Sequence, residues 1–351
     1  MQSKKTKQGT DNSIPAAGRP VSIGDVARAA SVSVATVSRV LNSPERVAPS
    51  TAERVQRIIE ELEYRPNHFA KGLITRRSHL LAIVLPDLSG EFYSELMTGA
   101  DEAARSLGYH LLVNSTGRRS ASEGGDEILG VGLLDGFVLL LTEPDEAALE
   151  RAANLGRPVV IVEADARSQG LDSVLVDNTS GARAAAEHLL SATAPDACYF
   201  VGGPPQNHDS VERANAFTAA LERQGHAARP DQVVFGDYGV AWGERWLQHR
   251  AAAGSASSIA VLAGNDEIAY GILSAAAREG IDVPTELRLV GFDNSGLSLL
   301  TRPKLSSVRL PATEVGAAAV EMLIRRIQQP DAAPSYVMLP TEFVPRESSA
   351  P

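Results

Sequence analysis

The apolar positions of residues 22–63 recur with the spacing of three short helices. In the first helix they stand at i, i+3, i+4 and i+7, which gathers them on one face. They are Ile23, Val26, Ala27 and Ala30. Ser22 and Asp25 lie three residues apart and predict a capping box at the start of this helix. Residues 31–33 interrupt the pattern, so we expect a turn there before a second helix.

The second helix combines an apolar face with an outward face of small side chains. Val37, Val40 and Leu41 take the inward positions. The outward positions have no core to fill, and they hold Val34, Ala35, Ser38, Arg39 and Asn42. Short uncharged side chains let a helix approach base edges in a major groove, and an arginine reaches guanine or phosphate. The pattern favours DNA contact; the alternative is an ordinary three-helix bundle with a solvated Ser/Thr face.

A third helix completes the predicted unit. Ser50 and Glu53 suggest a second capping box. The apolar spacing then continues through Val55, Ile58, Ile59 and Leu62. Three helices of this size can close a small core, so we expect a helix-turn-helix headpiece.

From residue 79 onward, in the part called the body, apolar strand runs alternate with helical patterns. The expected strands cover 80–85, 110–113, 136–141, 158–162, 173–177, 197–201, 232–235, 259–262, 287–291 and one near 336–343. Continuous apolar strands separated by helices predict parallel sheets covered on both faces. Because the body, residues 79–351, is too long for one such sheet, we expect an α/β fold with two doubly wound lobes. Ligands of open α/β sheets bind at the carboxyl ends of the strands, here in the cleft between the lobes.

The charge is divided unevenly along the chain. Residues 1–79 hold 13 Lys and Arg against 7 Asp and Glu, whereas the remainder holds 20 against 36. A basic end on an acidic protein concentrates attraction to phosphate where contact is wanted. Residues 1–20 are polar, without the apolar stretch of a secretory signal, and we expect a disordered leader and a cytoplasmic protein.

Cysteine usage excludes several kinds of site. Cys198 is the single cysteine and lies in an apolar run, where we expect a buried structural thiol. One cysteine excludes an intrachain disulfide framework and any zinc site built from several cysteines. We expect no cofactor, no metal and no membrane-spanning segment.

Polar and aromatic side chains follow most of the predicted strands. The candidates are Asp87, Glu163, Asp209, Arg213, Tyr238, Asn265 and Asp293. We interpret three similar positions, Asp177, Asp266 and Asn294, as helix caps. Carboxylates, an amide and an arginine beside an aromatic ring suit the vicinal hydroxyl groups of a sugar or polyol.

The segments Val-Ala-Thr-Val-Ser-Arg-Val-Leu-Asn (34–42) and Tyr-Arg-Pro-Asn (64–67) resemble the LacI/GalR family of bacterial transcriptional regulators. The resemblance runs to about residue 345. It implies that the hinge, residues 66–78, becomes helical on DNA and that Leu73 wedges between base pairs. The alternative for the hinge is a flexible basic linker with Leu73 packed on the body. The DNA contacts expected from pattern and resemblance are Ser22, Ile23, Ser33, Val34, Ala35, Thr36, Ser38, Arg39, Asn42, Asn67, His68, Ala70 and Leu73.

The resemblance also implies roles in the cleft. Arg213 matches an arginine that grips effector oxygens, Glu163, Asn265 and Asp293 match polar contacts, and Tyr238 matches an aromatic wall. Asp87 and Phe92 fall on the rim of the first lobe. A nucleobase or nucleoside is the alternative effector. Purine-binding relatives carry an arginine where this chain has Asn207, which argues against a purine.

The expected organisation is a leader (1–20), a headpiece (21–65), the hinge (66–78) and an effector-binding and dimerisation domain (79–345). Lobe one takes about 79–176 and 310–338, and lobe two takes about 177–309 and 339–347. Residues 117–130 depart from the family pattern, and we expect a shortened helix there. No leucine heptad follows residue 328, so a homodimer is expected.

These features and the resemblance predict a sequence-specific DNA-binding regulator, a repressor, that binds a palindromic operator as a dimer. A small effector of either sign would control it. A solute-binding protein of the transport class shares the two-lobed, periplasmic-binding-protein-like body, but the missing signal and the basic headpiece argue against it. An enzyme acting on a sugar is a third hypothesis. No nucleophile elbow, phosphate loop or paired Cys/His set is visible, so no catalytic residues are expected.

Overall fold

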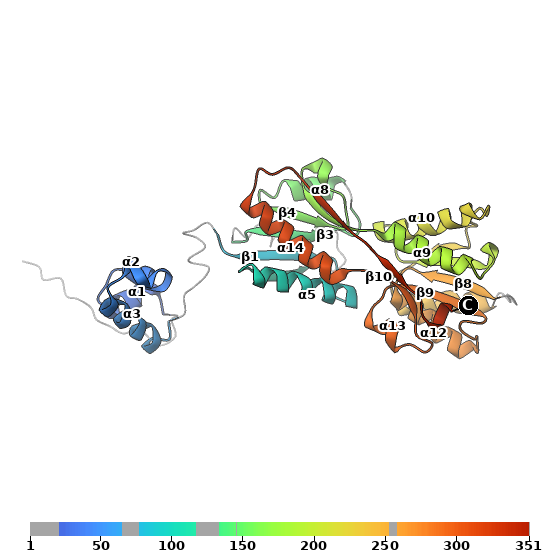
Figure 1. Cartoon of the computed structure of the whole chain (residues 1–351), viewed down its shortest axis with the longest axis horizontal. Helices are drawn as coiled ribbons and strands as arrows, with labels where there is room; N and C mark the ends of the chain where they lie inside the picture. The colour runs from blue at the N-terminus through green and yellow to red at the C-terminus, as the bar shows by residue number, and fades with distance from the viewer. Residues whose placement is uncertain (1–20, 65–76, 117–132, 145, 253–257, 351) are drawn as a thin grey trace, which may run out of the picture. The chain divides into compact units, whose positions relative to one another are not determined.

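The computed structural model describes residues 21–64, 77–116, 133–144, 146–252 and 258–350 (Figure 1). The chain divides into two compact units, residues 1–76 and 77–351, which are described separately. The leader 1–20, the segment 117–130 and the predicted DNA contacts Asn67, His68, Ala70 and Leu73 lie outside the described residues.

The headpiece consists of α1 (Ile23–Ala29), α2 (Val34–Asn42), the 3-10 turn η1 (Pro44–Arg46) and α3 (Pro49–Glu61). The predicted capping box of α1 is confirmed: the Asp25 amide donates to Ser22 Oγ at 3.3 Å, and the Ser22 amide donates to Asp25 Oδ2 at 2.9 Å. The predicted apolar face forms the core, whose buried members are Val26, Ala27, Ala30, Val37, Val40, Val55 and Ile59.

The second capping box was wrong. α3 begins at Pro49 with Ala48 as its N-cap, so Ser50 lies inside the first turn and is exposed. A proline suits the first helical position because its φ is already helical and its missing N–H would have no intrahelical partner. Pro49 therefore starts the helix before Ser50 can cap it.

Lobe one of the body is a six-stranded parallel sheet in the order β11-β5-β4-β3-β1-β2. Its strands are β1 (Leu80–Leu85), β2 (His110–Ser115), β3 (Gly136–Leu140), β4 (Val159–Val162), β5 (Asp172–Val176) and β11 (Tyr336–Leu339). Its helical segments are α5 (Glu91–Ser106), α8 (Glu146–Ala153), η2 (Arg167–Gln169) and α14 (Ala312–Gln328).

Lobe two is a second six-stranded sheet in the order β12-β10-β9-β8-β6-β7. Its strands are β6 (Cys198–Gly202), β7 (Val233–Phe235), β8 (Ile259–Ala263), β9 (Leu287–Asp293), β10 (Ser306–Arg309) and β12 (Glu342–Val344), of which only β12 runs antiparallel. Its helical segments are α9 (Asn178–Leu190), η3 (Pro195–Ala197), α10 (His208–Arg223), α11 (Val240–Ala252), α12 (Asp266–Glu279), α13 (Gly296–Leu300) and η4 (Glu347–Ser349).

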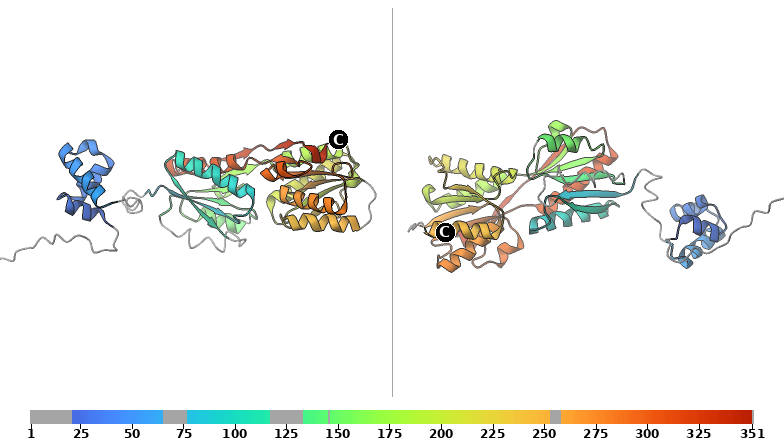
Figure 2. Two further views of the ribbon diagram at one scale, coloured as in Figure 1. Left: turned by 90° about the horizontal axis from the view of Figure 1, so that it is seen from below. Right: turned by 180° about the vertical axis from the view of Figure 1, so that it is seen from behind.

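Helices cover both faces of each sheet (Figure 2). Successive strand residues point to opposite faces, and the buried clusters follow this alternation. Ile83 packs in the cluster that includes residues of α5 and α14, whereas its neighbour Val84 packs with Leu149 of α8. In lobe two, Phe200 packs on the side of α9 and α10, and Val201 packs with residues of α11 and α12. The predicted two-lobed α/β fold is confirmed.

Two details of the body differ from the prediction. The single strand expected near 336–343 is two short strands in different sheets, β11 and β12, and the red C-terminal segment passes between the lobes (Figure 1). Pro340 interrupts the run because it has no N–H to donate to a ladder. Strand β10 was not predicted, because its buried Ser306 and Ser307 give no apolar run.

Helices α5 and α14 approach closely through two glycines. A Cβ on Gly99 would lie 1.9 Å from the Thr313 carbonyl oxygen, and one on Gly316 would lie 2.0 Å from that of Leu96. Only glycine permits this spacing. The contact fixes α5, whose first turn carries Phe92 and Tyr93, against the rest of lobe one.

The surface and the cysteine complete the picture. Cys198 is fully buried, as predicted, and burial raises the pKa of its thiol to about 12.

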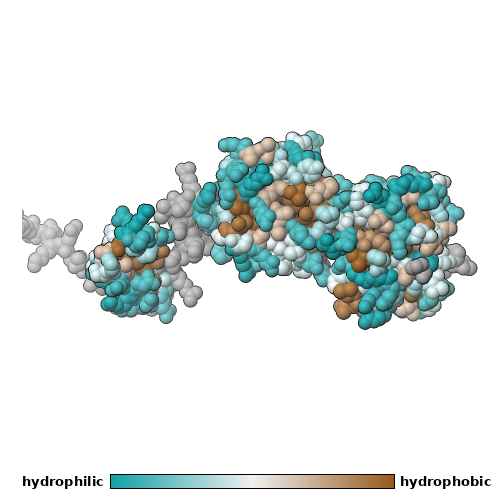
Figure 3. Space-filling view, viewed as in Figure 1, coloured by the Kyte–Doolittle hydropathy of each residue, from teal (hydrophilic) through white to brown (hydrophobic). Residues whose placement is uncertain are grey.

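No helix in the described part of the chain is long and apolar enough to cross a membrane. The face in Figure 3 is largely hydrophilic, with separate apolar patches, one of them in the region of α13, where Leu299 and Leu300 are exposed.

Candidate effector cavity and DNA-reading face

A cavity of about 890 Å³ lies between the two lobes of the body. It is lined by strand ends and helix starts of both sheets, the place where α/β folds bind ligands. The lining includes every residue predicted for the effector site: Asp87, Phe92, Glu163, Asp209, Arg213, Tyr238, Asn265 and Asp293. The structure therefore brings these side chains together, and their contact with a ligand stays a prediction.

Arg213 stands at the centre of the polar side of the cavity. Its side chain is buried on α10, where Nε donates to Asn178 Oδ1 at 2.8 Å and Nη1 donates to the Gly264 carbonyl oxygen at 2.7 Å. Nη2 lies 3.7 Å from Asp209 Oδ2, and the guanidinium rests 3.8 Å above the centre of the Phe292 ring. These contacts hold the cation in one orientation.

Three carboxyl groups surround this cation. Burial raises the pKa of Glu163 and of Asp293 well above the ordinary range, and neighbouring carboxylates raise both further while Arg213 lowers them. Burial also raises the pKa of Asp209, with Arg213 opposing it. Glu163 Oε2 is buried and has no hydrogen-bond partner among the described residues. The site holds more acid than its single arginine balances.

Backbone conformation aims two of these acids. Glu163 follows β4 with φ 71°, and Asp293 ends β9 with φ 108°. Non-glycine residues rarely adopt positive φ, and such strain is concentrated at functional sites. The turn that ends each strand thereby delivers a carboxyl group to the cavity.

Two tyrosines supply aromatic walls. Burial raises the pKa of Tyr93 and of Tyr238, and nearby carboxylates raise both further, so both phenols stay neutral. The Tyr238 hydroxyl donates to Asn207 Oδ1 at 2.9 Å. Tyr93 packs edge-on against Phe92, with 5.3 Å between ring centres. Tyr93 was not predicted, and its place directly after Phe92 in the first turn of α5 was the available signal.

The predicted helix caps need correction. Asp177 caps α9 as predicted, accepting from the Ser180 amide at 2.9 Å. Asp266 is not a cap: Asn265 caps α12, accepting from the Ile268 amide at 2.9 Å. Asp266 is buried instead among donors, which are the Ser295 amide at 2.8 Å, Ser295 Oγ at 3.0 Å and Ser307 Oγ at 2.6 Å. Burial raises its pKa to about 7 against these hydrogen bonds.

Asn294 is not a cap either. Its Oδ1 accepts from Arg346, and Ser295 is the residue that precedes α13. The motif Phe-Asp-Asn-Ser therefore builds a strand end and a loop rather than a helix start. Sequence spacing could not distinguish a loop from a helix cap here, because Asn and Asp are common in both.

Two hydrogen bonds, called the lobe clasps, join the lobes beside the cavity. The Gly296 amide of lobe two donates to Glu91 Oε1 of lobe one at 2.8 Å. The His208 amide of lobe two donates to the Thr142 carbonyl oxygen of lobe one at 3.0 Å. Opening of the lobes would have to break both bonds.

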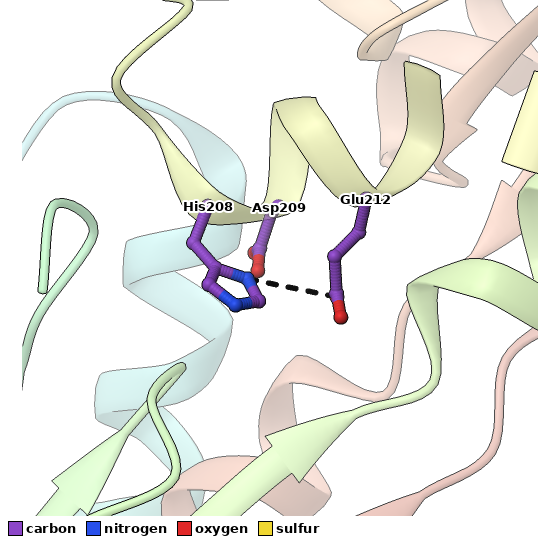
Figure 4. Close-up of side chains that lie close together, drawn as sticks. All are labelled: His208, Asp209 and Glu212. Atoms are coloured by element: carbon purple, nitrogen blue, oxygen red, sulfur yellow. Dashed lines mark ion pairs between the residues drawn. The ribbon is translucent and has the colours of Figure 1, made fainter. Parts of the chain in front are cut away.

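His208, Asp209 and Glu212 are close enough together to suggest a metal site, and all three come from the start of α10 (Figure 4). His208 Nδ1 lies 3.8 Å from Glu212 Oε2, which accepts from Asn178 Nδ2 at 3.2 Å. Asp209 faces the Arg213 guanidinium. Asp209 is thus already paired with an arginine and Glu212 already accepts a hydrogen bond, so we interpret the group as an ion-pair and hydrogen-bond network.

The outward face of α2 is accessible. Val34 is 47% exposed, which is unusual for an apolar residue, and Ala35, Arg39 and Asn42 are exposed with it. Arg39 has no ion-pair partner among the described residues, so its guanidinium is available to a ligand. A small-residue face with one extended cation fits a groove.

The other predicted contacts of the headpiece have partial structural roles. Ser33 caps α2, accepting from the backbone amide of Thr36 at 3.2 Å, and the side-chain Nδ2 of Asn42 donates to the Ser38 carbonyl oxygen at 2.8 Å. Ser22 is exposed but serves the α1 cap, and Ile23 is half-buried against the headpiece core. Thr36 and Ser38 are half-buried.

Comparison with known proteins identifies both units. Residues 22–67 match the family described as bacterial regulatory proteins, lacI family, and residues 186–349 match the periplasmic binding protein-like domain. Catabolite control protein A of Priestia megaterium is 31% identical over 335 residues, covering 94% of this chain and 99% of the relative. The chain belongs to the LacI family of bacterial regulatory proteins.

Further relatives agree with this assignment. The HTH-type transcriptional regulator DegA of Bacillus subtilis (strain 168) is 30% identical to this LacI-family chain, covering 94% of it and 98% of DegA. The solved complex of the transcriptional regulator CelR with cellobiose is 26% identical with a TM-score of 0.70, covering 94% and 100% of the two chains. The predicted family and its DNA-binding regulator function are confirmed, in preference to a solute-binding protein.

Proposed function

We propose that this LacI-family regulator binds a palindromic operator as a homodimer and acts as a repressor in the cytoplasm, without catalytic activity. The observation that carries the proposal is a packed headpiece that exposes a small-residue helix face, joined in one chain to a body with a polar cavity between its lobes. Two such headpieces would read two half-sites, because the symmetry of an operator mirrors the symmetry of the protein.

The cavity is proposed to hold a polyhydroxylated effector, a sugar or polyol. Carboxylates accept hydrogen bonds from hydroxyl groups, and the rings of Phe92, Tyr93 and Tyr238 offer faces for the C–H side of a sugar. The similar regulator CelR was solved with cellobiose. A nucleoside is the second candidate, because the adjacent rings of Phe92 and Tyr93 would also stack on a base.

Control is proposed to act through the lobe clasps. An effector shifts the equilibrium between lobe arrangements only by its difference in affinity for them. A ligand that bridges both lobes favours the clasped arrangement, whereas one that wedges them apart favours the open one. Either change would be passed to the hinge 66–78, where we propose that Asn67, His68, Ala70 and Leu73 meet the DNA. The effector is an inducer if it favours the arrangement with the weaker DNA binding, and a corepressor if it favours the one with the stronger DNA binding.

The test uses the full-length protein and genomic DNA fragments. The fragment that the protein captures preferentially from a genomic mixture is called the enriched fragment. Arg39→Ala should weaken binding to this fragment by about 1–3 kcal/mol, while binding to random duplex changes by much less. The matched control is Arg57→Ala, an exposed arginine on α3 outside the proposed reading face, which should affect both duplexes equally. Equal losses for Arg39→Ala on both duplexes would exclude base reading by α2.

A further inference from the structure

The cavity between the lobes is strongly acidic. Nine of its lining residues are Asp or Glu, and Arg213 is the single Lys or Arg among them. Vicinal hydroxyl groups alone would not call for such an excess, since a buried cluster of like charges is costly when its ligand is neutral. The acidic lining therefore points to a ligand that carries positive charge.

Several of the acids already have partners in the protein. Asp266 accepts three hydrogen bonds from Ser295 and Ser307, and Glu91 accepts the Gly296 amide of a lobe clasp. Asp209 pairs with Arg213. These acids organise the walls, and their negative charge is locally compensated by donors.

Glu163, Asp293 and Glu267 differ, because none of the described residues donates a hydrogen bond to their side chains. Glu163 is only 8% exposed, and its Oε2 is buried and unpartnered although it lines the cavity. A buried polar oxygen without a partner is rare in native structures and calls for an explanation. A ligand that donates a hydrogen bond and carries positive charge provides one.

We propose that the effector carries a protonated amine beside its hydroxyl groups, as an amino sugar or an aminated polyol does, and that this amine binds against Glu163 and Asp293. The inference rests on the proposed effector function of the cavity and narrows its ligand class. An ammonium group donates charge-assisted hydrogen bonds to carboxylates and relieves their mutual repulsion. The same carboxylates would repel an anionic ligand such as a sugar phosphate.

The directions of the pKa shifts in the cavity agree with this assignment. Burial and the neighbouring carboxylates raise the pKa of Glu163 and of Asp293, while the single nearby cation, Arg213, opposes the rise. A second positive charge, brought by the ligand, would oppose the rise further and favour the ionised form of each acid. The two carboxyl groups are thus arranged to prefer a cation to a neutral ligand.

The experiment compares matched ligands on the full-length protein by calorimetry and thermal shift. The probes are D-glucosamine, D-galactosamine and D-mannosamine, each beside its parent hexose, its N-acetyl derivative and its 6-phosphate. We expect at least one amine to bind about tenfold or more tightly than all three of its matched partners, a difference of about 1.4 kcal/mol. The proposal is overturned if none of the three amines binds more tightly than all of its matched partners, or if no amine binds at about 10 mM.

Variants locate the amine. Glu163→Gln and Asp293→Asn keep the shape of the side chain, and each should weaken amine binding about tenfold while changing that of the parent hexose less than about threefold. Glu150→Gln, an exposed acid on α8 outside the cavity lining, is the control and should leave the affinity unchanged. Equal losses for amine and hexose would overturn the assignment of Glu163 and Asp293.

Enrichment of genomic fragments, measured separately, distinguishes the two levels of the account. Specific DNA binding together with a neutral effector defeats the amine and leaves the proposed function standing. Amine binding without any preference among DNA fragments defeats the proposed function and leaves the ligand class standing.

Discussion

Replacing Arg213 by Met tests whether this arginine holds a group of acids together by charge. The substitution keeps an unbranched apolar side chain over the ring of Phe292 but removes the guanidinium. It leaves Asn178 Oδ1 and the Gly264 carbonyl oxygen without their donor, and it leaves Asp209 without its cation. The acidic side chains of the cavity then have no positively charged Lys or Arg among the lining residues.

The magnitude follows from the burial of the pair. Arg213 is 4% exposed and Asp209 is 8% exposed. Removing one member of a buried ion pair typically costs about 3–5 kcal/mol, because the remaining charge is stranded away from water. We therefore expect the free energy of unfolding to fall by about 4 kcal/mol at pH 8. The lost hydrogen bonds are part of this figure, since these effects are not additive.

The loss should depend on pH. Arg213 lowers the pKa of Glu163, Asp209 and Asp293, so its removal raises all three further above their unfolded values near 4. Between the unfolded and folded pKa values the native state holds more protons than the unfolded chain, so stability declines as pH rises through that window. At pH 5.5 protonation relieves the stranded charge, and we expect the loss to be smaller by at least about 1 kcal/mol.

Urea unfolding followed by tryptophan fluorescence measures this effect in the right lobe, because Trp242 and Trp246 both lie on α11 of lobe two. The control is Arg250→Met: Arg250 rests 4.5 Å above the Tyr199 ring, a comparable stacking outside the cavity lining. Its loss should be nearly independent of pH. Identical losses at pH 5.5 and pH 8 for Arg213→Met would refute the charge argument and leave only a packing role.

Three further changes have defined outcomes. Gly316→Ala should lower the free energy of unfolding by about 1–3 kcal/mol, because its Cβ would lie 2.0 Å from the Leu96 carbonyl oxygen; urea titration measures it, and a neutral result would mean that α5 and α14 separate freely. Glu91→Ala removes one lobe clasp and should change effector affinity by about tenfold through the lobe equilibrium, measured by calorimetry beside operator affinity; no change in either would remove the clasp from the mechanism. Leu73→Ala should reduce the bend of the bound operator in permuted-site electrophoresis, and an unchanged bend would exclude the proposed wedge.

Much of the fold could be predicted because its local signals agree with its tertiary structure. The helix spacing at Val26 and Val37 marked faces that are indeed buried, and the apolar run 80–85 coincides with β1. Failures arose where polar residues are buried by tertiary contacts. Ser306 and Ser307 are fully buried on β10, next to the edge strand β12. Hydrogen bonds to segments far along the chain hold them, and no local pattern indicates a strand there.

The candidate cavity was predictable for a topological reason. Carboxyl ends of parallel strands meet at one edge of each sheet, and ligands of α/β folds bind at such edges. Glu163, after β4 of lobe one, and Asp293, at the end of β9 of lobe two, could therefore both be assigned to the cleft between the lobes. The lobe clasps could not be predicted, because the contact of Glu91 with Gly296 depends on how two lobes face each other across 205 positions of sequence. The structural role of Asp266 was missed because its donors are distant in sequence: Ser295, after β9, and Ser307, in β10, lie 29 and 41 positions along the chain.

The most direct test of the account is the affinity of the full-length regulator for its enriched genomic fragment, measured with and without a saturating effector found in the ligand comparison. The account predicts a preference of at least about 10³ over random duplex at fixed salt, and a change in that affinity of about tenfold or more when the effector is added. A regulator that binds the effector yet shows the same affinity for its fragment in both conditions, or no preference for any fragment, would contradict it.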